Sequence, residues 1–506
     1  NQSTHFDFHI FFLPLVMEHG SVVSFLEGKT VLLTGAAGFL SKIFLEKVLR
    51  VQPNVKKIYL LLRAQDGDSA ALRLQNEIIG KDLFRILKEK WGAGFSSFIA
   101  CKTSLVAGDI SGGDELGISD PSLREEIYNS VDFVINLAAN TTFDERYDVA
   151  FGINTMGAIN VMNFAGKCIK LQALVHVSTA YVAGEKSGVI TETPCKMGVA
   201  LNGSPGLDID KEKELINDTL ESLQSRGATL DEIKDTMKDL GIERARSYGW
   251  PNTYVFTKAM GEMLVEKWRG TMSVAVVRPA IVTSTYREPF PGWVEGIRTL
   301  DSLTVGYGKG RVTCFLGNLD ATIDVIPADM VVNAMLVAMT LHAKQPHARV
   351  YHVGSSARNP MNFRKLWRIG YSYFTKNPWI GKDGKPVMVK EVRVLGSMAA
   401  FHRHIAVRYS ILLKGLELAK FTFGGYFKEL HDDLNRKIRF ITKVADLYRP
   451  YVFFDGIFDD TNTEKMRVAT RYESERDTIY FDPKCINWEE YFLSSHAPGV
   501  VKYVFK

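Results

Sequence analysis

The most specific chemical signal in the sequence is a tyrosine and a lysine four positions apart, Tyr254 and Lys258. Asn252 or Thr253, directly after Pro251, can cap a helix that begins here, so both side chains are expected on one helical face. A lysine ammonium beside a phenol lowers the pKa of the phenol, which favours proton transfer to a carbonyl oxygen near neutral pH. The spacing therefore predicts Tyr254 as a proton donor that Lys258 tunes.

Two hydroxyl residues, Ser178 and Thr179, follow the stretch Leu174-Val175-His176-Val177, which is typical of a buried strand. A tyrosine and a lysine at this spacing are common by chance. The pattern becomes much more specific when a strand ending in hydroxyl residues precedes it, in a sheet that opens with a glycine turn.

That glycine turn lies at residues 30–42, Thr-Val-Leu-Leu-Thr-Gly-Ala-Ala-Gly-Phe-Leu-Ser-Lys. A buried strand leads into a turn that contains Gly35 and Gly38, and a helix-like segment follows this turn. Backbone amides and a helix N-terminus can therefore approach a pyrophosphate. The last position of the usual glycine fingerprint is Ser41 instead of Gly or Ala. A plain strand–turn–helix corner therefore remains the alternative for this stretch.

Further buried strands are expected at 57–63, 105–110, 132–139 and 174–179, with helix-like stretches between them. Strands and helices that alternate in this way predict right-handed crossovers and a doubly wound parallel sheet of the α/β class. Ligands of such sheets bind at the carboxyl ends of the strands. Arg63 ends the second strand, where an arginine accepts a 2′-phosphate and favours NADP over NAD, although a solvated arginine is the alternative. Asp109 ends the third strand and suits the adenine edge.

Composition describes an ordinary globular chain of 506 residues, 46% hydrophobic and 24% charged. The formal net charge of +5 is too small to indicate nucleic-acid binding by itself, and no nucleic-acid-reading motif accompanies it. The five cysteines are odd in number and widely spaced, which predicts neither a disulfide framework nor a metal site and fits a reducing compartment.

The domain organisation is predicted in three parts. Residues 1–16 are expected to be a leader or a non-native extension, with a short membrane-touching arm as the alternative. Residues 17–358 form an NADP-binding reductase domain with a helical insertion at about 185–250, which is either a helical pair packed on the core or a mobile lid. Residues 359–506 form a C-terminal, mainly helical domain. Residues 288–317, rich in glycine, tryptophan and tyrosine, are a candidate wall of the substrate site.

The C-terminal region is basic and amphipathic between residues 393 and 428. Its apolar runs are too short to span a bilayer, but such helices suit a membrane surface. A helical domain packed on the reductase core is the alternative.

The motifs resemble those of a known enzyme superfamily. The glycine turn, Asn136-Leu-Ala-Ala, Ser178-Thr179-Ala-Tyr, the Tyr254 and Lys258 pair and Val277-Arg278-Pro279 resemble the extended short-chain dehydrogenases/reductases. A closer resemblance, from Met17 to the end, is to the plant-type alcohol-forming fatty acyl-CoA reductases. It rests on Phe143-Asp-Glu-Arg-Tyr-Asp-Val, His176-Val-Ser-Thr-Ala-Tyr-Val, Tyr248-Gly-Trp-Pro-Asn-Thr-Tyr, Pro289-Phe-Pro-Gly-Trp and Tyr351-His-Val-Gly-Ser-Ser.

This resemblance implies reduction of a long-chain acyl-CoA by NADPH to a primary fatty alcohol through a held aldehyde, as in wax or suberin synthesis. It also implies that Thr179, with Ser178 beside it, holds the acyl oxygen, that Tyr254 protonates this oxygen, and that Lys258 contacts the cofactor ribose. The residues expected at the cofactor are Thr34, Gly35, Ala37, Gly38, Phe39, Leu40, Arg63, Asp109, Ile110, Asn136, Ala138, Tyr254, Lys258 and Pro279, the last near the nicotinamide.

Most members of this family associate with the endoplasmic reticulum, so the resemblance implies peripheral membrane contact on the cytosolic face. Two other interpretations remain open at this point. One is a sugar-nucleotide epimerase or dehydratase of the same fold, and the other is a non-catalytic scaffold that binds NADP or lipid.

Overall fold

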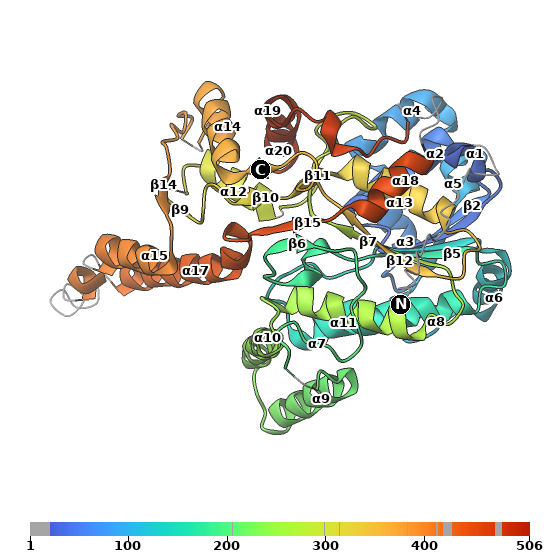
Figure 1. The fold of residues 1–506 in the computed structure, drawn as a ribbon, viewed down its shortest axis with the longest axis horizontal. Helices are drawn as coiled ribbons and strands as arrows, with labels where there is room; N and C mark the ends of the chain where they lie inside the picture. Colours follow the sequence, from blue (N-terminus) through green and yellow to red (C-terminus); the bar gives the residue numbers. More distant parts are fainter. Residues whose placement is uncertain are drawn as a thin grey trace, which may run out of the picture.

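The centre of the molecule is a parallel sheet of seven strands in the order β12-β7-β5-β4-β1-β2-β3 (Figure 1). This computed structural model describes residues 21–204, 206–297, 299–312, 314–381, 383–410, 413–417, 428–470 and 478–505. The order proceeds outward from β1 in both directions, which confirms the predicted doubly wound fold. The strands are β1 (Thr30–Thr34), β2 (Lys57–Leu62), β3 (Thr103–Ala107), β4 (Phe133–Asn136), β5 (Ala173–Val177), β7 (Val274–Pro279) and β12 (Ala348–Val353).

Helices cover both faces of this sheet (Figure 1). Side chains of β1 alternate between them: Val31 and Leu33 join the core that contains α2 and α13, and Leu32 joins the core that contains α8. A strand buried on both faces needs this continuous apolar run. One face carries α2 (Phe39–Val51) and α13 (Ala328–Leu341), and the other carries α6 (Pro121–Ser130), α8 (Gly157–Gly166) and α11 (Thr253–Trp268).

Two predicted elements differ from the observed ones: a strand ends earlier than expected, and a helix is broken into short pieces. The third strand was expected at 105–110, but β3 ends at Ala107, because Asp109 turns the chain by accepting the Ser111 amide. The helix expected between β2 and β3 is broken at Gly80, whose amide bonds to the Gln75 carbonyl. The pieces are α3 (Gly67–Arg73), the π-helical η1 (Leu74–Ile79), η2 (Asp82–Phe84), α4 (Arg85–Trp91), η3 (Gly92–Gly94) and α5 (Phe95–Lys102).

The loop that contains Glu288 and Glu295 covers the outer side of α2. This side of the helix is therefore buried. Lys42 pairs with Glu295 and Lys47 with Glu288, and both lysine side chains are buried. Phe39 stacks on Trp293 with ring centroids 5.2 Å apart. Residues 288–295, part of the expected wall at 288–317, therefore pack against α2, the helix that follows the glycine turn.

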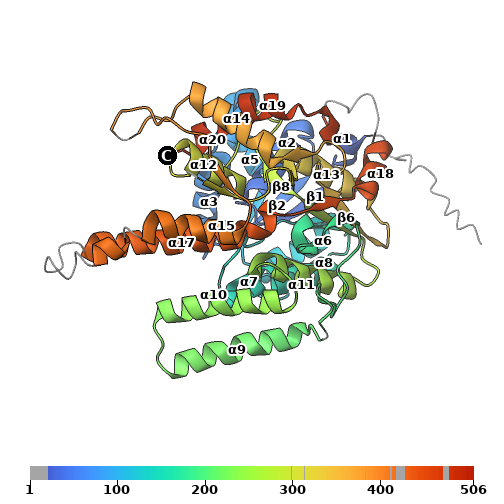
Figure 2. The ribbon, with the colours of Figure 1, turned by 60° about the vertical axis from the view of Figure 1, so that its left-hand side comes forward.

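The predicted helical insertion consists of two antiparallel helices, α9 (Ile209–Ser225) and α10 (Leu230–Ser247), which lie side by side in Figure 2. The break falls at Gly227, whose φ of +69° favours glycine. The close fit of α10 at Gly241, where a Cβ atom would lie 2.7 Å from Thr253 Oγ1, holds it against the start of α11. α10 thus packs on the core, against α7 (Tyr147–Ala150) and α11.

The chain beyond residue 359 has two parts. One part packs beside the sheet and returns to it, since β15 (Gly456–Phe458) pairs with β6 (Gly188–Ile190) and α18 (Thr461–Ala469) packs on β12 and α13. It also includes α14 (Phe363–Lys376), α19 (Trp488–Tyr491), the π-helical η9 (Phe492–His496) and α20 (Ala497–Tyr503), which pack near α12 (Thr299–Gly308) of the preceding region.

The other part is a helical hairpin that projects from the body of the molecule (Figure 1). It is made of α15 (Met398–Ile405), the π-helical η6 (Ala406–Ser410), residues 413–417 and α17 (Lys428–Val452). Phe401 and Ile405 pack against Ile438 and Ala445 of α17. No helix in the described part of the chain is long and apolar enough to cross a bilayer. The predicted leader 1–16 and the basic residue Lys420 lie outside the described residues.

Candidate active site

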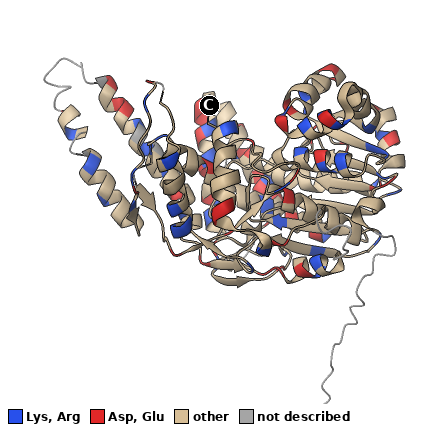
Figure 3. Cartoon of the chain, turned by 90° about the horizontal axis from the view of Figure 1, so that it is seen from above, with Lys and Arg blue, Asp and Glu red and all other residues tan. Residues whose placement is uncertain are grey.

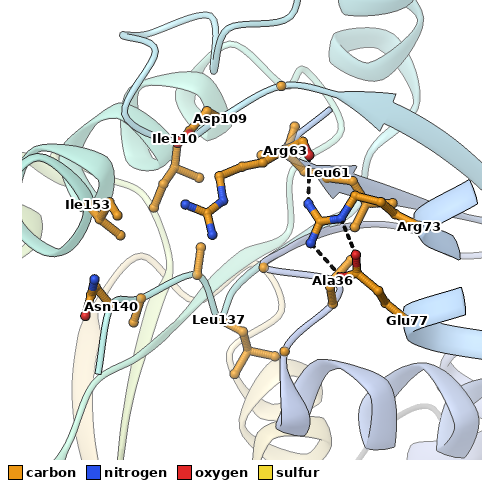
Figure 4. Close-up of a pocket in the computed structure, with 17 residues that line it drawn as sticks. Ala36, Leu61, Arg63, Arg73, Glu77, Asp109, Ile110, Leu137, Asn140 and Ile153 are labelled. Carbon is orange, nitrogen blue, oxygen red and sulfur yellow. Dashed lines mark hydrogen bonds and ion pairs between the residues drawn. The ribbon is translucent and has the colours of Figure 1, made fainter. Parts of the chain in front are cut away.

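A cavity of about 310 Å³ opens at the carboxyl ends of β1, β2, β3 and β4. It lies where a doubly wound sheet binds a dinucleotide. Residues from the turns after all four strands line it, and Figure 4 shows their side chains. Among the residues expected at the cofactor, those in the lining are Gly35, Ala37, Gly38, Arg63, Asp109, Ile110 and Ala138.

The turn between β1 and α2 requires glycine at position 35. Gly35 has a φ of +62°, and a Cβ atom built on it would lie 2.7 Å from the Ala138 Cα. A larger residue at this position would be strained by the positive φ and would clash with Ala138. The backbone therefore forms a narrow cradle that only glycine fits. Such a cradle fits a pyrophosphate, which binds backbone amides more closely than side chains allow.

The helix α2 begins at this cradle. Gly38 is its N-cap residue and provides no side-chain cap, so the positive end of the helix dipole and the first-turn backbone amides of α2 lie at this cradle. Ser41 is 1% exposed, and its Oγ has no hydrogen-bond partner. The hydroxyl therefore does not donate to the carbonyl one turn earlier, as serine hydroxyls in helices often do.

Two arginines lie at the outer end of the cavity. Arg63, directly after β2, is exposed and directs its guanidinium into the cavity (Figure 4). Arg73 on α3 donates to the Arg63 carbonyl at 2.7 Å and to the Glu77 carboxylate at 2.8 and 2.7 Å. Arg73 and Glu77 were missed in the sequence, where the only signal was a second arginine ten positions after Arg63.

The remaining residues of this half support the cavity floor. Thr34 Oγ1 donates to Asn136 Oδ1 at 2.7 Å, and Asn136 Nδ2 lies 3.2 Å from His176 Nδ1. Burial, together with nearby Lys258, lowers the pKa of His176 to about 3, so the ring is neutral. Asp109 Oδ1 accepts from the Ser111 amide and hydroxyl, which shapes the turn beside the cavity. Thr34 and Asn136 thus fix β1 to β4 and do not line the cavity.

The expected proton donor lies one strand along the same edge. Asn252 caps α11 through Oδ1, which accepts the Val255 amide at 3.1 Å, so the helix begins at Thr253, one residue before Tyr254. The Thr179 hydroxyl, after β5, lies within hydrogen-bonding reach of the Tyr254 phenol. Burial raises the pKa of Tyr254 to about 12, although the contact with Thr179 acts to lower it. The phenol is therefore protonated at neutral pH.

Lys258 is one turn further along α11 and is 2% exposed. Its Nζ donates to the Val177 carbonyl at 2.8 Å, and burial lowers its pKa to about 8 against the attraction of Glu262. The expectation that Lys258 lowers the pKa of Tyr254 does not hold in this structure, because the ammonium is turned to the strand and desolvation dominates at the phenol.

Ser178 lies on the other side of the strand end from Thr179. Burial opposes ionisation of the Glu262 carboxyl, but the Arg278 guanidinium holds its pKa below the usual value. The Ser178 hydroxyl is buried near this carboxyl and makes no hydrogen bond to a described residue. Glu262 and Arg278 form an ion pair in which both side chains are 3% exposed. Pro279 follows Arg278 at the end of β7, beside Val353 of β12. The structure thus brings Thr179 and Tyr254 together, and it places Ser178 with the buried ion pair.

An aromatic wall that the sequence did not reveal encloses Tyr254. Phe143, in the loop after β4, stacks on Tyr254 with ring centroids 6.1 Å apart and on Tyr451 at 5.0 Å. Tyr451 belongs to the last turn of α17 and bonds to Asn252, which is 199 residues away in the chain. No local pattern predicts a contact at that separation.

Comparisons with known proteins agree with this geometry. Two family profiles, both described as male sterility protein, match residues 33–335 (an NAD-binding region) and residues 410–506. An alcohol-forming fatty acyl-CoA reductase of Simmondsia chinensis is 54% identical over 490 residues, which cover 96% of this chain and 99% of the relative. Fatty acyl-CoA reductase 1 of Arabidopsis thaliana is 48% identical over 488 residues, with 96% and 99% covered.

Among solved structures, the terminal R domain of the myxalamid biosynthetic pathway has a TM-score of 0.56 and 18% identity, with 94% of this chain and 91% of that chain covered. The R domain of a nonribosomal peptide synthetase from Mycobacterium tuberculosis has a TM-score of 0.55 and the same identity and coverage. At this identity the likeness concerns the fold. The full-length sequence matches confirm the resemblance drawn from the motifs: the chain belongs to the family of alcohol-forming fatty acyl-CoA reductases.

Proposed function

We propose that this chain uses NADPH to reduce long-chain fatty acyl-CoA to a primary fatty alcohol through a bound aldehyde, with release of coenzyme A. The observation that carries the proposal is the pairing of the Thr179 hydroxyl with the protonated Tyr254 phenol, one strand away from the nucleotide cavity. Two neighbouring hydroxyl donors at this edge are suited to a carbonyl oxygen on which negative charge develops.

A bound nicotinamide supplies the hydride for each reduction. In the first step, negative charge develops on the thioester oxygen, and the hydroxyls of Thr179 and Tyr254 donate hydrogen bonds to it. Collapse of the tetrahedral centre reforms the carbonyl, breaks the bond between carbon and sulfur and releases the coenzyme A thiolate. The product of this step is an aldehyde, held by the same two donors.

In the second step the aldehyde oxygen becomes an alkoxide, and Tyr254 gives it a proton. A phenol with a pKa of about 12 is fully protonated before the reaction and transfers its proton readily to an alkoxide, which is a stronger base. Tyr254 is half-buried, and the apolar ring of Phe143 beside it lowers the local polarity, so the electrostatic stabilisation is stronger than in solution. Each reduction consumes one NADPH.

NADPH is proposed as the cofactor because of the two arginines at the outer end of the cavity. Arg63 directs its guanidinium into the cavity, and Arg73 lies beside it on α3. The Arg63 guanidinium suits a 2′-phosphate, and Arg73 holds the Arg63 backbone in place, whereas an acidic side chain at the end of β2 holds a 2′-hydroxyl. Gly35 and the first turn of α2 would hold the pyrophosphate, and Lys258 the nicotinamide ribose.

The proposed activity is tested by incubating the full chain with NADPH and acyl-CoA of several chain lengths and identifying the products by gas chromatography. Alcohol, with one coenzyme A released for each pair of NADPH molecules consumed, is the expected result. Aldehyde as the sole product would contradict the second step, and no product with any chain length would contradict the activity.

The proposal includes peripheral contact of the helical hairpin with a membrane on the cytosolic face of the endoplasmic reticulum. The hairpin projects from the body and carries basic side chains along it (Figure 3). Val407 is 67% exposed and has the exposed Arg403 and Arg408 near it in sequence. An exposed apolar side chain flanked by cations suits an anionic bilayer surface, which also holds acyl substrates.

Vesicle flotation tests this contact. The full chain is expected to float with vesicles that contain phosphatidylserine and to lose this binding when Val407→Asp and Arg408→Glu are combined. The matched control is Arg226→Glu at the C-terminal end of α9, outside the hairpin. Equal flotation of all three proteins would contradict hairpin docking. The location is checked by imaging a fluorescent fusion beside an endoplasmic reticulum marker.

A further inference from the structure

Three aromatic rings from distant parts of the chain form one stack beside the proton donor. Tyr451 of α17 stacks on Phe143 at 5.0 Å and an interplanar angle of 20°, and Phe143 stacks on Tyr254 at 6.1 Å and 18°. Tyr181, two residues after Thr179, meets the Tyr451 ring edge-on at 5.1 Å. The last turn of α17 therefore touches the segments that carry both proposed hydroxyl donors.

A buried hydrogen bond connects the same turn of α17 to the start of α11. Asn252 is completely buried, and its Nδ2 donates to the Tyr451 phenol oxygen at 2.8 Å. Its Oδ1 accepts the Val255 amide and caps the helix. Because both ends of one amide are bonded, the Tyr451 hydroxyl fixes the orientation of the residue that begins the helix of Tyr254.

Ion pairs hold the Phe143 loop from two sides. Asp144 lies 2.9 Å from Lys443 of α17 and 3.6 Å from Lys238 of α10. The loop is thus tied to α17 by one ion pair and by the stacked ring of Tyr451. The helix that forms half of the projecting hairpin also forms part of the reductase site.

We propose that Tyr451 is a positioning residue for Tyr254, acting through the cap residue Asn252 and through the ring of Phe143. This inference rests on the proposed reductase function. A donor must lie within a few tenths of an ångström of its working position, and a misplacement of about 1 Å costs on the order of a hundredfold in rate. The C-terminal region, which follows the NADP-binding part in sequence, therefore completes the geometry of the catalytic centre.

The first test is Tyr451→Phe, which removes the hydroxyl and keeps the stacked ring. We expect kcat with acyl-CoA to fall about tenfold, since one buried hydrogen bond to the helix cap is lost. The KM for NADPH and the melting temperature should stay close to those of the unchanged protein, because the nucleotide cavity does not include Tyr451. Tyr409→Phe, which removes a hydroxyl from the same hairpin away from α11, is the matched control.

An unchanged kcat would overturn the proposal. A parallel loss of kcat and NADPH binding, or a fall in melting temperature that accounts for the lost rate, would also overturn it by revealing a structural role. If the unchanged protein itself makes no alcohol or aldehyde, the proposed function fails first, so the two failures are distinguishable.

A double-mutant cycle with Asn252 isolates the proposed connection. Asn252→Ser keeps a helix cap and removes the amide that reaches Tyr451. If the two residues act through their shared bond, the double variant should be no slower than the slower single variant, within about twofold. Asn252→Asp keeps the cap and accepts a hydrogen bond from the Tyr451 hydroxyl, so it should restore most of the rate lost in Asn252→Ser. The proposal would be overturned if the rate losses of the two single variants multiplied in the double variant and Asn252→Asp restored none of the rate.

Discussion

The two halves of the site are built in opposite ways. The nucleotide half is an open cavity whose shape comes from backbone turns and small residues within the first half of the chain. The catalytic half is aromatic and largely buried, and it joins Thr179, Phe143, Tyr254 and Tyr451 from four separate segments. In the proposed function, one half recognises a charged ligand by exposed donors, and the other carries a half-buried proton donor.

This difference decides how each half responds to change. In the nucleotide half, a substitution acts through the space or charge that the cofactor needs, so binding should change before chemistry. In the catalytic half, burial has already shifted the pKa values of Tyr254, Lys258 and His176, so a substitution there should change chemistry before binding. The predictions below separate these two responses.

The largest effect is expected for Tyr254→Phe. Loss of a general acid typically costs about 10²- to 10⁴-fold in rate. We expect alcohol formation to fall by this factor, with NADPH affinity almost unchanged because Tyr254 does not line the nucleotide cavity. Single-turnover kinetics and fluorescence titration of NADPH measure the two quantities. Alcohol formation at an unchanged rate would mean that another group donates the proton.

The corresponding change in the nucleotide half is Gly35→Ala. The new methyl group would strike the backbone at Ala138 in a conformation that only glycine favours. We expect NADPH affinity to fall at least about tenfold and the free energy of unfolding to fall by about 1–3 kcal/mol. Gly67→Ala is the control, since its Cβ atom meets open space. Calorimetric titration and thermal melts check both; equal behaviour of the two variants would refute the cradle.

Cofactor selectivity should depend on the two arginines. Arg63→Ala is expected to weaken NADPH binding about 10- to 100-fold and to leave NADH binding unchanged, because only the phosphate contact is removed. Arg73→Ala is expected to weaken NADPH binding as well, since it also removes the bonds that Arg73 makes to the Arg63 carbonyl and to Glu77. Binding of 2′,5′-ADP against 5′-AMP provides a measurement that does not depend on catalysis. A constant ratio of the two affinities in both variants would argue that the 2′-phosphate is bound elsewhere.

The pH dependence should report Lys258. Its pKa is lowered from 10.5 to about 8 by burial, so the free enzyme loses the ammonium as the pH rises through 8, while Tyr254 keeps its proton up to about pH 12. We expect kcat/KM for NADPH to decline several-fold above about pH 8 and the decline to disappear in Lys258→Arg. Between pH 8 and 10.5 the unfolded chain holds this proton and the folded chain does not, so the same group makes stability rise with pH. A profile that stays flat to pH 10 would contradict the lowered pKa.

The smallest effect is expected for Ser41→Ala. The Ser41 hydroxyl is buried without a partner, so its removal should leave NADPH affinity within about twofold and raise the free energy of unfolding by about 0.5–1 kcal/mol. Thermal melts and NADPH titration measure both. Clearly weaker binding would show that the hydroxyl takes part in the cofactor site; stronger binding in Ser41→Gly would show that the serine impairs it.

Local patterns were sufficient for the nucleotide half because its residues are close in sequence. The run around Gly35, the apolar strand before Arg63 and the acid at Asp109 each belong to a short stretch with its own strand and turn. The ends of strands were predicted less accurately. At β3, the turn made by Asp109 competes with the hydrogen-bond ladder of the sheet. Arg73 was missed because a helical arginine is ordinary until the cavity beside it is known.

The catalytic half was predicted in its types and not in its electrostatics. The spacing of Tyr254 and Lys258 correctly placed both on α11. It did not show that the Lys258 ammonium bonds to the Val177 carbonyl, that Ser178 faces Glu262, or that burial raises the pKa of Tyr254. These outcomes depend on which side of a strand end each group occupies and on how much water remains there.

By itself, the sequence determined the parallel α/β sheet, the glycine cradle and the place of the proposed proton donor on a helix, because each is encoded in residues a few positions apart. The tertiary structure alone decided the protonation states and the partners of that donor. Desolvation depends on everything packed around a group, and the bond between Asn252 and Tyr451 joins residues whose separation in sequence leaves no local trace.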